Sequence, residues 1–526
     1  MISSLVAGCA LLSPVSAQAA PTSGATTAGE VTDKSYTPPP IEWAACTNGL
    51  QHLGGECGFL VVPLDYSRPH GTKIKIAVSR IKHTSSEADY QGAMVVNLTW
   101  PGGSALSQST VGKLLPEAIS GDYDWIGFDP RGVGASEPTL SCDSGLDYYS
   151  RPSYEPTSRQ HLSTLMEYAQ FYSKACAKTN SPLLRHATTT HTVKDLDSLR
   201  KALGLSQINY YGYLYGAYLG EVYSSMYPTR VRRMILDSSI DPRKVWFSFN
   251  NGQDAPLDQN FSAFSAWVAK YDNLYHLGTT ENAVKKQYYS TLAKLAKKPA
   301  EGVYGAAVWT DVALLAYNTS HWKTLAEAFS AYINKGETAP LKALYDANYP
   351  TSGDNNQAMS MATMCTDTRW PRDWRTWLRV AEDHHRKWPL AAWANTWYVA
   401  SCQSWKVPPQ KPAVVDGSKA PAILMVLDTT IDPASTYEGS LAVRKLFPKA
   451  VLVQSGATPA DSATPTSCSP GAAIAAYLND GTLPPRVAGN TADLKCPANP
   501  LPDPTSAASA QNSPLGGLTV TSPAGQ

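Results

Sequence analysis

Six short apolar runs, separated by stretches with a helical pattern, do most to constrain how this chain of 526 residues can fold. They cover residues 94–98, 125–128, 208–213, 234–236, 422–427 and 450–453. Continuous apolar runs that alternate with helices are typical of strands buried on both faces of a mostly parallel sheet. Two segments rich in β-branched residues, 58–64 and 73–81, predict a hairpin. We therefore expect an α/β fold whose central sheet is flanked by helices.

Residues 245–410 interrupt this rhythm, because their apolar positions repeat with a helical period and few strand candidates occur among them. Helical patterns cover, for example, residues 261–271, 281–295, 322–333 and 374–385. We interpret 245–410 as a helical cap inserted between a first half of the core, 41–244, and a second half, 411–496. Polar segments at 20–40 and 497–526 predict a disordered leader and a disordered tail.

The first residues have the pattern of an export signal. An apolar stretch ends in Ala-Gln-Ala at 17–19, which predicts a signal peptide over residues 1–19 and a secreted protein. The sequence VAGC, ending at Cys9, also resembles a lipobox, so a lipid anchor on Cys9 is the less favoured alternative. We favour cleavage after residue 19 because the apolar run continues past Cys9. No later segment has the roughly 18–20 apolar residues that a membrane span requires.

Eight cysteines remain once the signal peptide is removed, and an even number in an exported chain predicts disulfides. Eight cysteines permit 105 pairings. Joining neighbours along the chain is the simplest choice and gives Cys46–Cys57, Cys142–Cys176, Cys365–Cys402 and Cys468–Cys496. Neither a C-x-x-C pair nor a histidine cluster has metal-ligand spacing, so we expect no metal and no cofactor.

The charge of the chain is balanced, with 44 Lys and Arg against 43 Asp and Glu. This balance supplies neither a basic field for nucleic acid nor a polybasic patch for anionic lipid. We therefore expect no nucleic-acid partner. As separate expectations, the protein is a monomer and its ligand is a peptide or a small molecule.

The most informative motif is a strand that runs into a helix through a G-Y-L-Y-G turn centred on Leu214. In a nucleophile elbow, glycines stand two residues before and two after the central residue, because the two backbones nearly collide there. The central residue is held in a strained conformation that presents its side chain to the pocket. Gly212 and Gly216 are both in place, but Leu214 has no oxygen with which to attack a carbonyl.

The chain resembles the secreted tripeptidyl aminopeptidases of streptomycetes, which are relatives of proline iminopeptidase within the α/β hydrolases. The resemblance extends from about Ile41 to Cys496. It includes DWIGFDPRGVGAS at 124–136, close to the family's D-x-x-G-x-D-P-R-G-x-G-x-S, and also segments 195–204 and 370–395. It implies an α/β-hydrolase fold with an inserted helical cap and a site built around a Ser-Asp-His triad.

Several active positions of that family differ in this chain. The family's elbow reads G-x-S-Y-G-T, so the resemblance assigns Leu214 to the position of the nucleophile. The family's oxyanion loop resembles N-P-G-G-P-G-G-S-G, whereas residues 97–105 read N-L-T-W-P-G-G-S-A. The lost glycines matter because backbone N–H groups must turn toward the oxyanion there. The residues implied for the oxyanion region are Trp100, Gly102, Gly103 and Tyr215.

The acid of the triad is retained, but the base is not. Asp432 matches the acid in the family's D-x-x-T-P-Y-E-G-A motif. The family's base follows the last strand in a G-S-H-G-like turn, where this chain has Pro459. No histidine occurs after His385, although the order Ser…Asp…His requires a late one. Because triad residues act as one unit, we expect no peptidase activity through this triad.

Three classes of function remain open. The first is a binding protein that captures a peptide or small molecule in a pocket that Leu214, Trp100 and Met364 make more apolar. The second is an enzyme repurposed for non-hydrolytic chemistry, for example in a biosynthetic pathway. The third is a hydrolase with a displaced nucleophile, although each candidate serine can also be interpreted as a turn or capping residue. The candidate serines are Ser104, Ser136 and Ser435.

Overall fold

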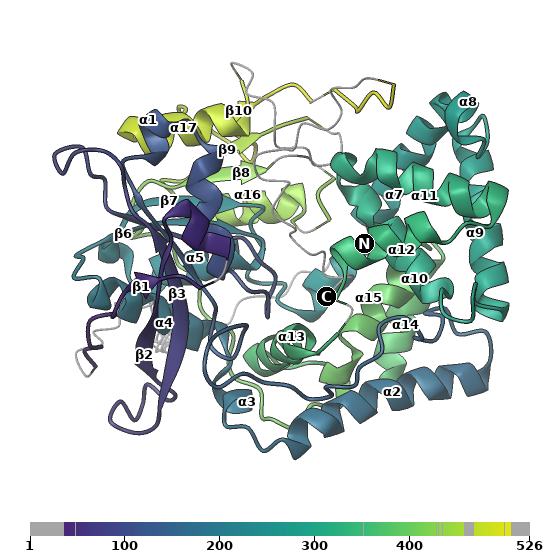
Figure 1. The fold of residues 1–526 in the computed structure, drawn as a ribbon, viewed down its shortest axis with the longest axis horizontal. Helices are drawn as coiled ribbons and strands as arrows, with labels where there is room; N and C mark the ends of the chain where they lie inside the picture. Colours follow the sequence, from purple (N-terminus) through teal and green to yellow (C-terminus); the bar gives the residue numbers. More distant parts are fainter. Residues whose placement is uncertain are drawn as a thin grey trace, which may run out of the picture.

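A ten-stranded sheet forms the centre of the protein, in the order β1-β2-β3-β5-β4-β6-β7-β8-β9-β10 (Figure 1). The computed structural model describes residues 36–47, 49–350, 352–427, 429, 431–433, 435–456, 468–498 and 500–505. The strands are β1 (Ala44–Ala45), β2 (Glu56–Pro63), β3 (Lys73–Ile81), β4 (Ala93–Asn97), β5 (Asp124–Phe128), β6 (Ile208–Tyr213), β7 (Val231–Asp237), β8 (Leu424–Leu427), β9 (Val451–Gln454) and β10 (Leu494–Lys495).

The strand pairing confirms the mostly parallel sheet. The six apolar runs of the sequence form β4 to β9, which lie side by side and pair in parallel. The predicted hairpin is β2–β3, and antiparallel pairing continues from β3 to β5. The parallel strands are apolar throughout because both of their faces are covered. Val95 packs in a core with α4, α5 and α16, whereas Val96 faces the core that includes α17.

The helices that cover the sheet lie on both sides of it. Those on the Val95 side are α4 (Thr189–Ala202), α5 (Tyr215–Met226) and α16 (Tyr437–Leu446). On the other side is α17 (Pro470–Asp480), beside the short α1 (Glu117–Ser120). Figure 1 shows α1 and α17 together along the upper margin of the sheet.

All elements between β7 and β8 in the described chain are helical, and the principal ones gather beside the sheet in Figure 1. Many of them share a separate aromatic core that includes Phe264, Trp309 and Phe329. The α-helices are α6 (Phe247–Gly252), α7 (Asp254–Lys270), α8 (Asp272–Tyr275), α9 (Glu281–Lys297), α10 (Ala306–Leu314), α11 (Trp322–Lys335), α12 (Ala339–Asn348), α13 (Asn355–Asp367), α14 (Trp374–His385) and α15 (Ala392–Tyr398).

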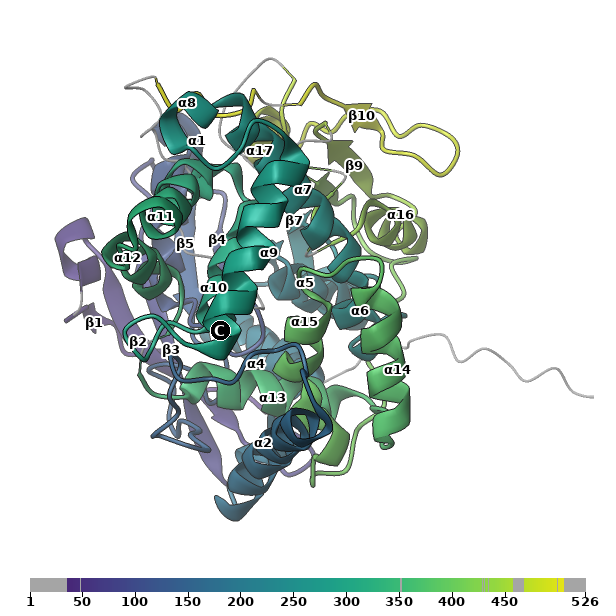
Figure 2. The same cartoon turned by 90° about the vertical axis from the view of Figure 1, so that its right-hand side faces the viewer.

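The chain between β5 and β6 adds two more helices, α2 (Arg159–Lys178) and α3 (Leu183–His186). Both views show α2 beside α13 at the lower margin of the helical layer (Figures 1 and 2). Helices α2 and α3 both lie outside residues 245–410, the range that the sequence pattern indicated for the cap.

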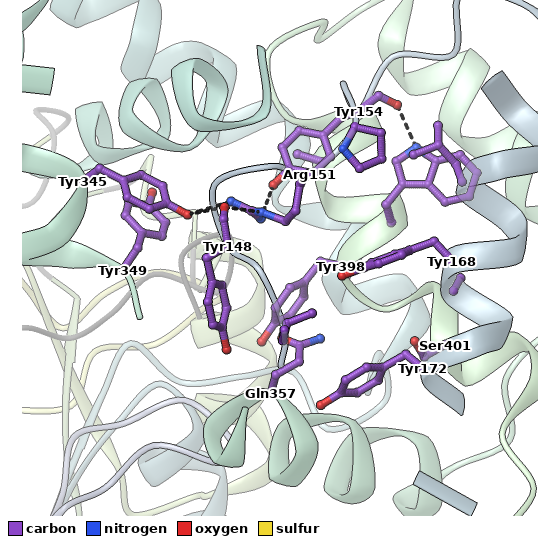
Figure 3. A pocket seen from close by; sticks show the side chains of 16 residues that line it. Tyr148, Arg151, Tyr154, Tyr168, Tyr172, Tyr345, Tyr349, Gln357, Tyr398 and Ser401 are labelled. Atoms are coloured by element: carbon purple, nitrogen blue, oxygen red, sulfur yellow. Dashed lines mark hydrogen bonds between the residues drawn. The ribbon is translucent and has the colours of Figure 1, made fainter. Parts of the chain in front are cut away.

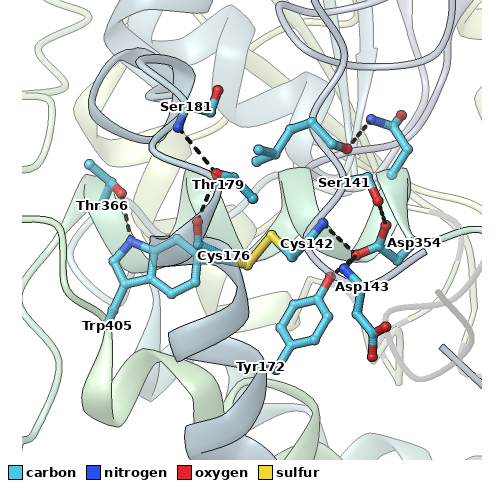
Figure 4. Close-up of a disulfide and its surroundings, with 12 residues drawn as sticks. Ser141, Cys142, Asp143, Tyr172, Cys176, Thr179, Ser181, Asp354, Thr366 and Trp405 are labelled. Atoms are coloured by element: carbon cyan, nitrogen blue, oxygen red, sulfur yellow. Dashed lines mark hydrogen bonds between the residues drawn. A yellow bond between two sulfur atoms is a disulfide. The ribbon is translucent and has the colours of Figure 1, made fainter. Parts of the chain in front are cut away.

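Hydrogen bonds and a disulfide fix the segment that leads into α2 (Figure 4). Cys142 is bonded to Cys176 near the end of α2. The buried carboxylate of Asp354 accepts hydrogen bonds from the backbone N–H groups of Cys142 and Asp143, at 2.8 and 2.6 Å. It also accepts one from the Tyr172 hydroxyl at 2.9 Å. This network joins the 142–143 segment, α2 and the start of α13.

Four disulfides join neighbouring cysteines, which confirms the simplest of the pairings considered from the sequence. The bonds are Cys46–Cys57, Cys142–Cys176, Cys365–Cys402 and Cys468–Cys496.

The ends of the described chain are packed against the core. The buried Tyr36 donates its hydroxyl to the Val61 carbonyl at 2.7 Å, and Trp267 Nε1 donates to the Pro502 carbonyl at 2.8 Å. The disorder expected for 20–40 and 497–526 therefore does not extend to Tyr36 or Pro502. The signal peptide and Cys9 lie outside the described residues. Over the described ranges, no helix combines the length and apolar character needed to cross a bilayer.

Candidate functional site

The turn between β6 and α5 retains the backbone of a nucleophile elbow, with Leu214 at its centre. Leu214 has φ 55° and ψ −113°, a conformation that costs a non-glycine residue on the order of 1–3 kcal/mol. Its N–H donates to the Asp237 carbonyl at 3.1 Å, and its carbonyl accepts from the N–H of Tyr218 at 3.1 Å. The side chain is buried, with 2% of its surface exposed. The strained position is therefore occupied by an apolar side chain.

Close backbone contacts explain the two flanking glycines. A Cβ atom on Gly212 would lie 2.2 Å from the Gly216 carbonyl oxygen. A Cβ atom on Gly216 would lie 1.7 Å from the carbonyl oxygen of Asn97, at the end of β4. No side chain fits at either position, so the sequence motif follows directly from the packing of β4, β6 and α5.

The loop after β4 is filled by Trp100. This side chain is completely buried, stacked on Phe249 at 5.7 Å and edge-on to Trp246 at 6.3 Å between ring centroids. Trp246 also lies 6.0 Å from the ring of Tyr215, the first residue of α5. An aromatic cluster therefore joins the loop to the elbow.

The same loop lies against helix α13. Gly102 has φ +90°, and a Cβ atom there would meet the Asn356 carbonyl oxygen at 2.4 Å. At Gly103 a Cβ atom would meet the Cβ of Thr99 at 2.8 Å. The hydroxyl of Ser360, also on α13, donates to a carbonyl of the loop. The two remaining glycines are thus required by packing, which leaves this part of the loop closely covered.

Asp432 lies at the edge of the sheet where β7 and β8 end. The Ser238 hydroxyl donates to Asp432 Oδ2 at 2.5 Å, and the N–H of Ser435 donates to Oδ1 at 3.3 Å. Ser238 follows β7 directly, and its N–H donates to the Val426 carbonyl of β8 at 3.0 Å. The structure thus brings Asp432 and Leu214 to the same edge of the sheet. Pro459 lies outside the described residues.

All ten histidines lie in the described part of the chain, and none of them pairs with Asp432 there. His384 contacts Asp254 at 2.8 Å and His83 contacts Asp124 at 2.8 Å. Neither of these carboxylates belongs to the Asp432 turn.

The three alternative serines make ordinary structural contacts. Ser104 donates to Asp129 Oδ1 at 2.6 Å, and Ser136 donates to the Asp129 carbonyl at 2.7 Å. The Ser435 hydroxyl lies 3.4 Å from that of Ser440. A serine nucleophile requires an adjacent general base. In the part of the chain that the structure describes, these hydroxyls contact no histidine, which fits the interpretation of the three serines as turn residues.

A cavity of about 100 Å³ lies within the helical layer, between α2, α12, α13 and α15 (Figure 3). Aromatic side chains dominate its wall, which includes Trp397 and seven tyrosines. The tyrosines are Tyr148, Tyr154, Tyr168, Tyr172, Tyr345, Tyr349 and Tyr398. The expectation of a pocket lined by Leu214, Trp100 and Met364 is wrong for this cavity, since none of the three reaches its wall. Each is buried in the core instead.

The one charged side chain of the wall, Arg151, makes four hydrogen bonds to protein groups. It donates to the hydroxyls of Tyr154 and Tyr345 at 2.6 and 2.8 Å and to the Tyr148 carbonyl at 2.9 Å. It also forms an ion pair with the buried Asp311. Figure 3 shows this guanidinium held within the ring of tyrosines. The wall therefore offers no free charge to a ligand.

Polar groups that lack a protein hydrogen bond are few in this wall. Among the described residues they are the Gln357 amide and the hydroxyls of Ser401 and Tyr168. Burial raises the pKa of Tyr398 to about 12, so its hydroxyl is neutral and donates to Ser360 at 3.3 Å. Since Ser360 also donates to the Trp100 loop, two hydrogen bonds connect the cavity wall with that loop.

This cavity could hardly be predicted from the sequence. Its tyrosines come from three separate stretches of chain, 148–172, 345–349 and 398, which meet only because α2 packs into the helical layer. The one available signal was the unusual density of tyrosine between residues 148 and 172.

Comparison with known proteins identifies two matching family models, "alpha/beta hydrolase fold" at residues 92–308 and "TAP-like protein" at residues 389–493. The tripeptidyl aminopeptidase of Streptomyces coelicolor is 37% identical over 412 residues, covering 74% of each chain. The serine protease Hip1 of Mycobacterium tuberculosis is 29% identical over 485 residues, 85% of this chain and 90% of that protein. Carboxylesterase B of the same organism is 28% identical over 503 residues, 90% of this chain and 95% of its own.

Proposed function

The chain belongs to the tripeptidyl aminopeptidase family of α/β-hydrolase-fold proteins, and from this premise we propose that it is a binding protein without triad-based peptidase activity. It captures a peptide or small molecule beneath its helical cap and does not cleave it.

The observation that carries the first half of this proposal is Leu214 at the centre of an otherwise intact elbow. Its φ of 55° and the close contact of Gly216 with Asn97 preserve the geometry that presents a nucleophile, but the side chain carries no nucleophilic atom. Trp100, completely buried beside Trp246, adds bulk to the loop from which oxyanion donors would come. The absence of a histidine after His385 removes the general base.

The tyrosine-lined cavity supports the second half. Ligand sites are concave and mostly apolar, with a few polar groups that fix orientation. An apolar cavity of about 150 Å³ binds benzene, so about 100 Å³ accepts one group of roughly ring size or smaller. Because Arg151 is neutralised by Asp311, the group that enters should be uncharged. The hydroxyl of Ser401 and the amide of Gln357 remain to orient it.

We also propose that the mature protein is a monomer secreted from the cell. Four disulfides support this, since such bonds persist in oxidising compartments. The Ala-Gln-Ala sequence at 17–19 supports cleavage by a signal peptidase, with anchoring through Cys9 as the alternative.

A repurposed, non-hydrolytic enzyme is the second candidate, and the retained Asp432 is the observation in its favour. The carboxylate is buried at the edge of the sheet, where active-site acids of this fold stand. Its bonds from Ser238 and Ser435 also suit a purely structural role, so we place this candidate second.

A thermal-shift screen of peptides, culture metabolites and pathway intermediates tests the binding proposal. A ligand present at 100 times its Kd should stabilise the protein by about 2.7 kcal/mol. Ala169→Leu, which projects into the cavity from α2, should remove that shift while the unliganded protein still unfolds cooperatively. Ala177→Leu on the same helix but outside the cavity wall is the matched control and should keep the shift. If no compound shifts the melting temperature, or if Ala169→Leu leaves the shift intact, the proposed site is wrong.

A further inference from the structure

Asp65, His186 and His191 lie close together at a half-buried position, although the aspartate is far from the histidines in sequence. One oxygen of Asp65 and one ring nitrogen from each histidine all lie within 4.8 Å of one another. We propose that these three side chains bind a divalent transition-metal ion, with Zn²⁺ as the best match. None of the three belongs to the elbow or to the cavity, so the site is independent of the proposed function.

The fold positions each ligand through a different element. Asp65 stands in the turn that follows β2. His186 is the last residue of α3, and His191 lies in the first turn of α4. The break between α3 and α4 brings the two rings together edge to face, with centroids 5.1 Å apart and planes at 80°. A continuous helix would separate residues five apart onto different faces.

The distance between the two imidazole nitrogens fits a shared metal ion. His186 Nδ1 lies 3.3 Å from His191 Nε2. Two ligands of a tetrahedral zinc, each bonded at about 2.0–2.1 Å, stand about 3.3–3.4 Å apart. The same 3.3 Å is also within reach of a direct N–H···N hydrogen bond, so the nearby Asp65 oxygen is what distinguishes a metal site from a bare histidine pair. The half-buried Asp65 supplies an oxygen within 4.8 Å of both nitrogens, and a fourth position remains for water.

A second layer of contacts orients the ligands. His191 Nδ1 lies 2.7 Å from the Thr188 hydroxyl, so Nε2 is the nitrogen that faces His186. Asp65 Oδ1 accepts from the N–H and the hydroxyl of Ser67 at 2.8 and 2.7 Å. Hydrogen bonds of this kind fix the ring tautomer and carboxylate orientation in protein metal sites.

The neighbouring cations do not prevent metal binding. Arg131 is fully buried near the cluster, but its charge is balanced by Asp195 at 2.7 Å. Arg68, 3.4 Å from Asp65, has 84% of its side chain exposed and can swing into solvent.

Equilibrium dialysis of the full mature protein against ZnCl₂, after treatment with a chelator, tests this site. The wild type should retain about one zinc ion per chain, and His186→Ala and His191→Ala should lose it. Asp65→Asn, which keeps the turn and its shape, should weaken zinc binding at least about tenfold. His70→Ala, an exposed histidine outside the cluster, is the control and should bind as the wild type does.

Zinc X-ray absorption gives a readout that does not depend on how well the variants fold, and it should report two imidazole ligands in the wild type. A wild type that retains no stoichiometric zinc would overturn the proposal and leave the two rings as a hydrogen-bonded pair. Equal zinc content in wild type and a folded His186→Ala would also overturn it, because the metal would then be bound elsewhere.

Discussion

Gly216 lies directly against the backbone of Asn97, so that a Cβ atom on the glycine would stand 1.7 Å from the asparagine carbonyl oxygen. This contact joins the start of α5 to the end of β4, and it persists in a chain whose elbow carries leucine. The glycine of the elbow therefore also has a structural role, because it determines how closely α5 packs on the sheet.

Gly216→Ala should destabilise the protein by about 3 kcal/mol or more, since overpacking against an immobile backbone shifts β4 or α5. Gly252→Ala is the matched control, because a Cβ atom at Gly252 meets nothing within 4 Å. Chemical denaturation of both variants measures the difference. If the two variants were equally stable, α5 or β4 would be able to move aside at little cost, and the inference from the close contact would be wrong.

Restoring two triad residues should not restore the enzyme. Leu214→Ser combined with Pro459→His supplies a hydroxyl and an imidazole. Trp100 still stands in the loop, however, and the glycines that the family has there are still absent. Removing one oxyanion donor costs about 10²–10³ in kcat, so the double variant should stay at least that far below a streptomycete tripeptidyl aminopeptidase. A chromogenic tripeptide substrate measures this. Cleavage at a family-like rate would show that the loop still provides its donors.

Asp367, buried behind the elbow, should make stability fall between about pH 4 and pH 6. Burial raises the pKa of Asp367 to about 6, although hydrogen bonds from Thr189 and Trp246 act in the opposite direction. In this range the folded protein keeps a proton that the unfolded chain releases, so the free energy of unfolding decreases as pH rises. About two pKa units at 1.4 kcal/mol each give a fall of about 3 kcal/mol.

Asp367→Asn should flatten that part of the stability profile, measured by urea denaturation at several pH values. Asp383→Asn, at a half-exposed position on α14, is the control and should leave the profile unchanged. An unaltered slope in Asp367→Asn would show that this carboxyl is already ionised in the folded protein at pH 4.

The purified protein without residues 1–19 should contain four disulfides and no free thiol. Alkylation without reduction, followed by mass spectrometry, counts free cysteines, and two or more labelled residues would contradict this. Replacing Cys142 and Cys176 together by serine should cost about 2–5 kcal/mol, because the bond closes the segment that leads into α2.

Much of the fold could be predicted from the sequence, because parallel strands buried on both faces are apolar at every position. Val95 and Val96 face opposite cores. Strands of this kind therefore appear in the sequence as continuous apolar runs, without alternating apolar and polar residues. The elbow was equally clear, since the requirement for Gly212 and Gly216 is a local steric one.

Features that depend on long-range packing could not be predicted. The tyrosine-lined cavity exists because α2 joins helices from the other half of the chain, and no local pattern encodes that contact. Asp65 likewise meets His186 and His191 only in the folded protein. Trp100 could be expected to crowd its loop, but its packing against Phe249 and Trp246 could not be predicted, and it does not line the tyrosine-lined cavity.

Reaction with a serine-directed fluorophosphonate, read by intact mass, tests most directly whether this family member has lost its nucleophile. Leu214 cannot be phosphonylated, and Ser104, Ser136 and Ser435 have no adjacent histidine to activate them. We expect the mass of the protein to be unchanged under conditions that fully label a streptomycete tripeptidyl aminopeptidase. A stoichiometric adduct that maps to any serine would contradict it and show that a displaced nucleophile keeps the protein a hydrolase.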